Sequence, residues 1–320
     1  MKVILTGGAG FIGSCLLWKL NENGITDILV VDHLDDLKWK NLINKKFTDY
    51  IEKDEFIKFI CEGKVERPDF LIHLGACTRT TEKNASYIIN NNYIYSRKLA
   101  EWAVKNNVNF LYASSAATYG GGENGFSDDD KNTLKLKPLN LYGFSKHLFD
   151  LWVINNGLSD RFVGFKFFNV FGPNEYHKKD MKSVVAKAFY QIKENGVLRL
   201  FKSYRSDFKD GEQKRDFIYV KDVVDVIYYF IENPDKKGIF NVGTGKARSF
   251  NELGECIFEI LGKEKRIEYI DMPEDVKKHY QYFTKANIEK LRRAGYDKEF
   301  TDFKRAISEY IEYLKEGKHL

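Results

Sequence analysis

The chain has few of the residues that hold small secreted folds together. Its 320 residues include only four cysteines and five prolines. The cysteines, at positions 15, 61, 77 and 256, are widely separated and form no C-x-x-C pair, which argues against a disulfide framework and against a zinc site. We therefore predict reduced thiols and no bound metal.

Long apolar runs and concentrated charge are missing too. No run approaches the ~20 residues of a membrane-spanning helix, and the apolar run at 3–5 is too short for a signal peptide. Lysine and arginine number 51 against 46 acidic residues, a net charge of +5 without a basic stripe. We predict a cytoplasmic protein that binds neither membrane nor nucleic acid, and a small anionic ligand would account for the mild positive charge.

Short apolar runs alternate with segments of helical period along the first half of the chain. Strand-like runs lie at 3–5, 28–31, 70–72, 110–112 and 163–168, with helical patterns between them, as at 12–20 and 87–105. Continuous apolar runs are typical of strands buried on both faces, so the pattern predicts an α/β fold with a parallel sheet. After residue 168 the alternation loosens. Helical patterns at 181–193 and 250–261 predict a smaller second lobe there.

The stretch TGGAGFIG places Gly7, Gly10 and Gly13 between the first predicted strand and the first predicted helix. Glycines at such a turn permit positive φ and a close approach of the backbone to a pyrophosphate, which the helix N-terminus attracts. Asp32 ends the second predicted strand about 20 residues further on, where a carboxylate can accept hydrogen bonds from a ribose. The combination predicts a dinucleotide site rather than a purely structural turn.

The choice between NAD and NADP is open on these residues. Asp32 alone favours NAD, because its charge repels a 2′-phosphate. Lys38 and the more distant Lys53 could approach that phosphate and offset the repulsion, although each is also an ordinary surface residue on base rates.

A serine, a tyrosine and a lysine follow in an order that suits hydride transfer. Tyr142 and Lys146 are four residues apart at the start of a predicted helix, so they lie on one face. The ammonium can help to lower the pKa of the phenol from its usual value of about 10, and Ser115 can hydrogen-bond the same substrate oxygen. Y-x-x-x-K alone is common by chance, but the order of the three motifs favours catalysis.

These motifs resemble those of the extended short-chain dehydrogenase/reductase family. TGGAGFIG, SSAATYG and YGFSK are joined by FFNVFGP, KRDFIYVKDVVD and NVGTG, so the resemblance covers nearly the whole chain. It implies a Rossmann-like doubly wound parallel sheet with a smaller α/β substrate-binding lobe. We predict that the NAD(P)-binding domain comprises 1–168 plus roughly 216–244, and that the substrate lobe comprises mainly 169–215 plus 245–320.

Within that family, ACTRTTE, FLYASSAATYGG and FFNVFGPNEYHK are similar to strings of the heptose epimerases. This resemblance implies inversion at C6 of an ADP-activated heptose through a transient 6-keto sugar, in the synthesis of the lipopolysaccharide inner core. It also implies NADP as the usual cofactor, with NAD as the other possibility, and a homo-oligomer, typically a pentamer. The alternatives are another nucleotide-sugar 4-epimerase or dehydratase, and a non-catalytic NAD(P)-binding regulatory module. Ala116 and Ala117 argue against a dehydratase, which usually carries an acidic residue beside the catalytic serine or threonine.

The resemblance also implies a second acid/base group besides Tyr142. The ketone must turn between removal and return of the hydride, so its oxygen needs a partner in each orientation. In the heptose epimerases a lysine after the FGP loop has this role, and the matching residue in GPNEYHKKDM is Lys178. Lys179 remains an alternative, and HKKDMK is also compatible with an exposed helix start.

The remaining site residues are implied by position in the same match. Besides the three glycines, those assigned to the cofactor are Phe11, Ile12, Asp32, His33, Lys38, Lys53, Leu74, Gly75, Ala76, Cys77, Thr78, Asn91, Lys146, Val170 and Lys178. Those assigned to the nucleotide-sugar substrate are Ser115, Asn169, Asp180, Lys187, Phe201, Lys202, Ser203, Arg215 and Tyr280. Asp180 and Lys187 differ from the family's usual residues, and the stretch 204–213 is longer than the usual connection before Arg215.

Overall fold

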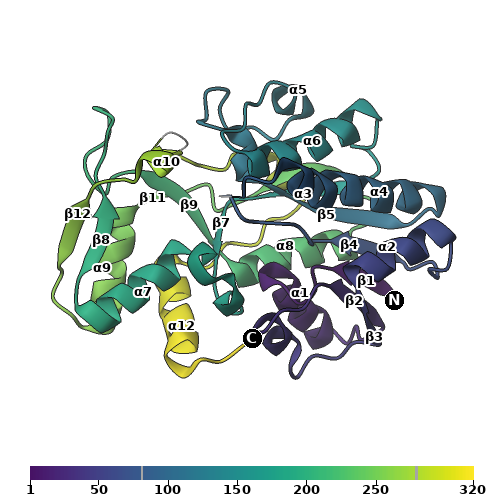
Figure 1. Cartoon of the computed structure of the whole chain (residues 1–320), viewed down its shortest axis with the longest axis horizontal. Helices are drawn as coiled ribbons and strands as arrows, with labels where there is room; N and C mark the ends of the chain where they lie inside the picture. Colours follow the sequence, from purple (N-terminus) through teal and green to yellow (C-terminus); the bar gives the residue numbers. More distant parts are fainter. Residues whose placement is uncertain (81, 278–279) are drawn as a thin grey trace.

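The computed structural model describes residues 1–80, 82–277 and 280–320 (Figure 1). At its centre lies a seven-stranded parallel sheet with the order β3-β2-β1-β4-β5-β6-β10. The strands are β1 (Val3–Thr6), β2 (Ile28–Asp32), β3 (Asp49–Glu52), β4 (Phe70–His73), β5 (Asn109–Ser115), β6 (Val163–Phe167) and β10 (Gly238–Val242). The strand order reverses between β1 and β4, and folds of this kind bind dinucleotides at that switch point.

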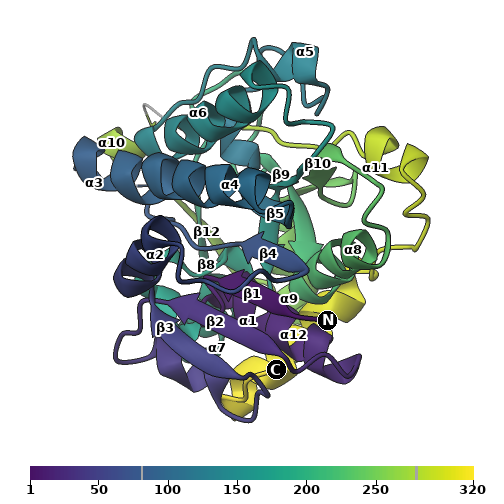
Figure 2. The same ribbon diagram turned by 90° about the vertical axis from the view of Figure 1, so that its right-hand side faces the viewer.

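Helices cover both faces of this sheet (Figure 2). One face carries α1 (Phe11–Glu22) and α8 (Val220–Glu232), and the other carries α2 (Lys53–Glu62), α4 (Tyr95–Lys105) and α6 (Leu141–Asn155). Successive residues of a strand point to opposite faces, so Val3 and Leu5 enter the first core while Ile4 enters the second. Burial on both sides explains why the strand sequences are continuously apolar.

A smaller lobe follows the sixth strand of the large sheet and lies at the left of Figure 1. It holds a three-stranded sheet, β11-β9-β7, and a two-stranded sheet, β12-β8. The strands are β7 (Asn169–Phe171), β8 (Leu198–Phe201), β9 (Lys214–Tyr219), β11 (Ala247–Ser249) and β12 (Ile267–Ile270), and the main helices are α7 (Val184–Asn195), α9 (Phe250–Leu261) and α12 (Phe303–Glu316). The exact division of the chain into two domains stays a prediction.

Short helical segments connect these elements. They are η1 (Lys38–Leu42), α3 (Ala85–Ile89), η2 (Asn90–Ile94), η3 (Ala116–Tyr119), α5 (Asp130–Thr133), η4 (Tyr176–Met181), α10 (Glu274–Lys277) and α11 (Glu289–Arg293). Among the described residues, no helix is long and apolar enough to cross a membrane.

The structure confirms the predicted fold class and the five predicted strands. β3 was not predicted, because it is a polar edge strand whose residues are exposed or half-buried. The helix expected over 181–193 begins later, at Val184, because Ser183 caps it and Lys179 has a positive φ of 47° that interrupts helical geometry before it.

Candidate active site

The glycine turn packs closely against the segment that follows β4. Gly7 has a φ of +73°, and a Cβ placed on it would lie 2.5 Å from the backbone nitrogen of Gly75. A Cβ on Gly13 would lie 2.0 Å from the carbonyl oxygen of Gly7. The N–H of Gly10 donates to that same carbonyl at 3.0 Å. Two of the three glycines are therefore required by the packing of the turn itself.

The first turn of α1 is suited to an anionic ligand. In the part of the chain that the structure describes, no side chain caps this N-terminus at Gly10. The first N–H groups of a helix have no partner within the helix, and the helix dipole places partial positive charge there. Phe11 and Ile12 begin this turn, so their position fits the pyrophosphate of a dinucleotide.

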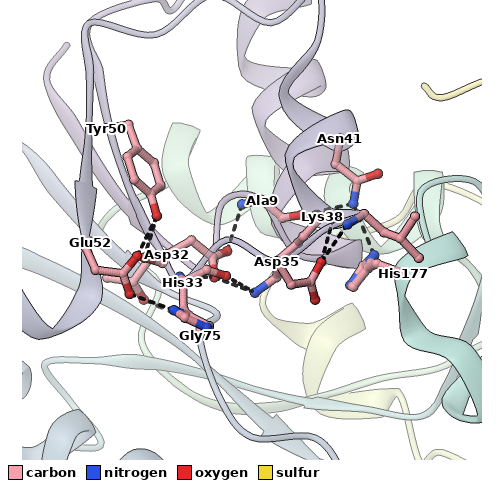
Figure 3. A network of polar contacts seen from close by, with 12 residues as sticks. Ala9, Asp32, His33, Asp35, Lys38, Asn41, Tyr50, Glu52, Gly75 and His177 are labelled. Atoms are coloured by element: carbon pink, nitrogen blue, oxygen red, sulfur yellow. Dashed lines mark hydrogen bonds and ion pairs between the residues drawn. The ribbon is translucent and has the colours of Figure 1, made fainter.

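Asp32 lies at the end of β2 in a network of charged groups (Figure 3). Its carboxylate is buried and accepts hydrogen bonds from the backbone N–H of Ala9 at 2.9 Å and from the Lys38 ammonium at 2.5 Å. Lys38 also donates to the carbonyl oxygen of His33 at 3.1 Å. Lys53 instead pairs with its neighbour Asp54 at 2.7 Å. The charge of Asp32 is thus balanced by Lys38, so this carboxylate would repel a 2′-phosphate less than an unpaired one would.

Asn41 joins the glycine turn to a distant loop, and sequence reasoning missed it. Its buried amide donates to the carbonyl oxygens of Ala9 at 2.9 Å and Asn174 at 3.1 Å, and its nitrogen lies 3.3 Å from Nδ1 of His177. Burial lowers the pKa of His177 to about 4, so this imidazole is neutral at pH 7. The segment that carries Lys178 is therefore fixed relative to the glycine turn.

The segment after β4 holds five of the predicted cofactor residues, Leu74, Gly75, Ala76, Cys77 and Thr78. It is fixed by Asn92, whose buried amide accepts from the Cys77 N–H at 2.7 Å and donates to the Cys77 carbonyl at 2.9 Å. Asn91, the residue predicted from the family match, donates to the carbonyl oxygen of Tyr87 at 2.8 Å. The run Asn90 to Asn92 was the available signal for the missed Asn92.

Ser115, Tyr142 and Lys146 come from the end of β5 and the start of α6. Lys146 is 4% exposed and donates to the carbonyl oxygen of Ala113 at 3.0 Å, and burial lowers its pKa to about 8. Burial also raises the pKa of Tyr142, while the Ser115 hydroxyl acts in the opposite direction. The protein by itself therefore leaves the phenol protonated at neutral pH.

A buried ion pair lies behind these three residues. Asp150 and Lys166 have fully buried side chains, with 2.6 Å between Oδ2 and Nζ. Ser114 donates to the same carboxylate at 2.7 Å, and Lys166 donates to the Thr118 hydroxyl at 3.0 Å. That hydroxyl in turn donates to the carbonyl oxygen of Ser115 at 2.8 Å. Asp150 follows Tyr142 and Lys146 at a further spacing of four, a signal that sequence reasoning did not use.

The two candidate lysines of HKKDMK differ in burial. The Lys178 ammonium lies 5.2 Å from the centre of the Phe11 ring, in the first turn of α1, and burial lowers its pKa. Lys179 is exposed, as are Asp180 and Lys187. Lys178 is thus the lysine of this pair that lies against the first turn of α1, next to the glycine turn.

Several predicted substrate residues meet in the smaller lobe. The Arg215 guanidinium is 7% exposed and lies 5.2 Å from the centre of the Tyr280 ring. The Phe201 ring meets Tyr280 edge-on at 6.3 Å. Lys202 instead pairs with Asp271 at 3.2 Å, where the Lys202 side chain is partly exposed and the Asp271 side chain is largely exposed. Arg215, Tyr280 and Phe201 form a compact aromatic and cationic cluster.

Three other predicted positions lie at the borders of the lobe. Asn169 begins β7 and is exposed, with its side chain 3.5 Å from the Thr284 hydroxyl, and Val170 follows it. The backbone N–H of Ser203 donates to Asp210 at 2.7 Å. The connection over 204–213 is therefore folded back on its own start.

Within the described ranges, no group of three or more His, Cys, Asp or Glu side chains is placed to hold a metal ion.

Comparison with known proteins gives one consistent family. Residues 3–243 match the NAD dependent epimerase/dehydratase family. An ADP-L-glycero-D-manno-heptose-6-epimerase of Nitratidesulfovibrio vulgaris (strain DP4) is 52% identical over 314 residues, which cover 97% of each chain. The crystal structure of the Helicobacter pylori ADP-L-glycero-D-manno-heptose-6-epimerase is 30% identical, with a TM-score of 0.83 and coverage of 98% of this chain and 96% of that one. A UDP-N-acetylglucosamine 4-epimerase structure from Methanobrevibacter ruminantium M1 is 25% identical, with a TM-score of 0.84 and coverage of 99% of both chains.

Proposed function

The chain belongs to the NAD dependent epimerase/dehydratase family, and from this premise we propose that it is an ADP-L-glycero-D-manno-heptose 6-epimerase. The observation that carries the proposal is that the chain is 52% identical, over 97% of its length, to a protein of that name. Backbone likeness alone does not select the substrate, because a 4-epimerase for a different sugar nucleotide is equally similar in fold.

We propose that the reaction inverts C6 of ADP-D-glycero-D-manno-heptose through a 6-keto sugar. The C6 hydroxyl loses its proton to a protein base as the C6 hydride leaves, and the ketone then turns in the site. The hydride returns to the opposite face of C6 while a second protein group protonates the oxygen. A bound nicotinamide dinucleotide would accept the hydride and return it, and the positive charge of its oxidised form would favour ionisation of the phenol.

Tyr142 is the first acid/base group in this proposal. Its hydroxyl is beside Ser115, which can hydrogen-bond the substrate oxygen and stabilise alkoxide character. Burial opposes ionisation of the phenol, so ionisation depends on nearby positive charge. Lys146 is buried and follows Tyr142 by four residues on the same face of α6. We propose that its ammonium is the positive charge that the protein supplies to the phenol.

Lys178 is the second acid/base group, in preference to Lys179. Its side chain is half-buried and lies over Phe11 in the first turn of α1, whereas Lys179 is exposed. Burial lowers the pKa of Lys178, which favours proton exchange closer to neutral pH. Its position after β7, away from α6, suits a group that meets the sugar oxygen in its second orientation.

NADP is the cofactor that we favour, with NAD as the alternative. Lys38 neutralises Asp32 at 2.5 Å, which removes much of the repulsion that this carboxylate would exert on a 2′-phosphate. For the substrate, Arg215 and Tyr280 offer a cation and an aromatic ring, a combination suited to a nucleoside diphosphate. We also propose a homo-oligomer, to be tested by light scattering of the purified protein.

The test of the proposal is direct. Purified protein is incubated with ADP-D-glycero-D-manno-heptose, and the C6 configuration is followed by NMR until equilibrium between the epimers is reached. A protein that leaves this sugar unchanged and epimerises UDP-glucose or UDP-N-acetylglucosamine would be a 4-epimerase of the same family. Lys178→Met is expected to lose epimerisation and keep cofactor binding, while Lys179→Met is the matched control and keeps both.

A further inference from the structure

A buried carboxylate closes the base of the loop that carries Lys178. We propose that Glu175 is a positioning residue for the epimerisation, which holds the loop over 176–182 so that Lys178 reaches the sugar oxygen. This inference rests on the proposed function and extends it to a residue that does not touch the substrate.

The contacts of Glu175 join both ends of the loop. Its carboxylate is 1% exposed, and Oε2 accepts the backbone N–H of Ser183 at 2.5 Å. Oε1 accepts the Ser183 hydroxyl at 2.5 Å and the Tyr310 hydroxyl at 2.8 Å. Ser183 caps α7 and Tyr310 belongs to α12. One side chain therefore ties the start of the loop to its end and to the C-terminal helix.

The residue before Glu175 is fixed on the opposite side. Asn174 is fully buried in left-handed geometry, with φ of 74°. Its amide donates to the Ser14 hydroxyl on α1 at 3.0 Å, and its carbonyl oxygen accepts from Asn41 at 3.1 Å. A non-glycine residue in this conformation costs free energy, so surrounding contacts must hold it there. The base of the loop is thus bound to α1 on one side and to α12 on the other.

Before Lys178 the loop is also held by the Tyr176 hydroxyl, which donates to the carbonyl oxygens of Tyr313 at 3.0 Å and Lys318 at 2.8 Å, and by His177 beside Asn41, whereas the residues just after Lys178 are exposed. Lys179 and Asp180 are exposed, and Lys179 has a positive φ of 47°. The backbone N–H of Lys178 donates to the carbonyl oxygen of Glu175 at 3.0 Å, which is a local turn contact. Because the exposed residues after Lys178 do little to fix the loop, the position of Lys178 depends on the contacts of Tyr176 and His177 before it and on those of Glu175 at the base of the loop.

The carboxylate also acts on Lys178 electrostatically. Burial lowers the pKa of Lys178, and the negative charge of Glu175 partly opposes this change. Glu175→Gln therefore keeps the size of the side chain but removes that charge and one acceptor oxygen. Tyr310→Phe removes one contact with Glu175, and Ser183→Ala removes one such contact together with the cap of α7. Both leave the charge in place, so together the three variants separate geometry from charge.

The test uses the asymmetry of a two-base reaction. Oxidation of one C6 epimer employs Tyr142 and oxidation of the other employs Lys178, so single-turnover reduction of the bound nicotinamide is measured with each epimer separately. Lys178→Met sets the reference by slowing oxidation of one epimer only. Glu175→Gln is expected to slow that same epimer by about 100-fold, because a displacement near 1 Å costs that much in rate. Tyr310→Phe is expected to slow it by about three- to tenfold, and the other epimer should react normally in both variants.

Each outcome has a defined meaning. Suppose that Lys178→Met slows oxidation of one epimer only. The role of Glu175 is then overturned if its variants slow oxidation of both epimers equally, or if none of the three variants slows either oxidation. An absence of asymmetry in Lys178→Met itself means that the two-base reaction is wrong and the inference fails with it. Ser249→Ala is the matched control, since Ser249 forms a serine and glutamate capping box on α9 in the same lobe. It is expected to lower thermal stability and leave the ratio of the two rates unchanged.

Discussion

Replacing Asp150 by asparagine removes one charge from the buried ion pair that Thr118 links to the backbone of Ser115. The carboxylate lies 2.6 Å from the Lys166 ammonium, and both side chains are fully buried. It also accepts hydrogen bonds from Ser114 at 2.7 Å and from Tyr112 at 3.1 Å. Asparagine keeps the shape and one acceptor oxygen, so the main change is an uncompensated charge on Lys166.

The expected loss of stability is large for a single substitution. Removing one member of a buried ion pair typically costs about 3–5 kcal/mol, because the remaining charge is left without compensation in a poorly polarisable interior. The free energy of unfolding of a typical domain is about 5–15 kcal/mol, so Asp150→Asn should remove about a fifth or more of it. Replacing both partners, as in Asp150→Leu with Lys166→Met, should recover most of the loss, since apolar pairs of similar volume replace buried ion pairs at little cost.

The assay is urea unfolding at pH 7 followed by circular dichroism, with epimerase activity measured on the same samples. Glu268→Gln breaks an ion pair with Arg199 at 3.1 Å in which both side chains are more than half exposed, and it should change stability by less than about 1 kcal/mol. A loss below about 1 kcal/mol in Asp150→Asn, or a double variant no more stable than the single one, would refute the reasoning. Activity should fall in the folded fraction too, because Lys166 acts on the Ser115 backbone through Thr118.

Three further predictions concern the glycine turn, Lys38 and Lys146 on α6. Lys38→Ala leaves the charge of Asp32 unbalanced, so the affinity for NADP relative to NAD should fall about tenfold in fluorescence titrations, and an unchanged ratio contradicts this. Gly13→Ala should abolish cofactor binding and lower the midpoint of thermal unfolding more than Gly10→Ala does, because the added carbon meets a carbonyl oxygen at 2.0 Å rather than 3.1 Å. Because the pKa of Lys146 is about 8, its positive charge is lost as the pH rises through that value, and kcat/KM should fall there. Lys146→Arg, if active, should move this fall to higher pH, and an unmoved profile would assign the ionisation to another group.

The parts of the candidate site whose geometry could be predicted from sequence are those with a local physical signature. Gly7 and Gly13 were predictable because backbone geometry and close packing leave no room for a side chain. Tyr142 and Lys146 were predictable because a spacing of four places two residues on one helix face. The α/β fold class was predictable, because buried apolar runs alternate with helical patterns along the chain.

The contacts that fix these residues were not predictable, because they join segments far apart in the chain. Asn41 and Asn174 are 133 positions apart, and Glu175 and Tyr310 are 135 positions apart. Asparagine and glutamate are common on protein surfaces, so their identity alone gives no sign of burial. Only the folded structure shows that Asn174 and Glu175 are buried and hydrogen-bonded.

The two proposed acid/base groups rest on separate supports, and the reaction itself requires this. Tyr142 and Lys146 occupy one face of α6, and Asp150 ties that helix to the strand end that carries Ser115. One face of one helix can meet the sugar oxygen from one side only, so a group for the turned ketone must come from another element. Lys178 comes from a loop that Glu175 ties to α7 and α12. Because the supports share no residue, a substitution in one should impair oxidation of a single epimer, whereas a substitution in the glycine turn beneath both should impair the two equally.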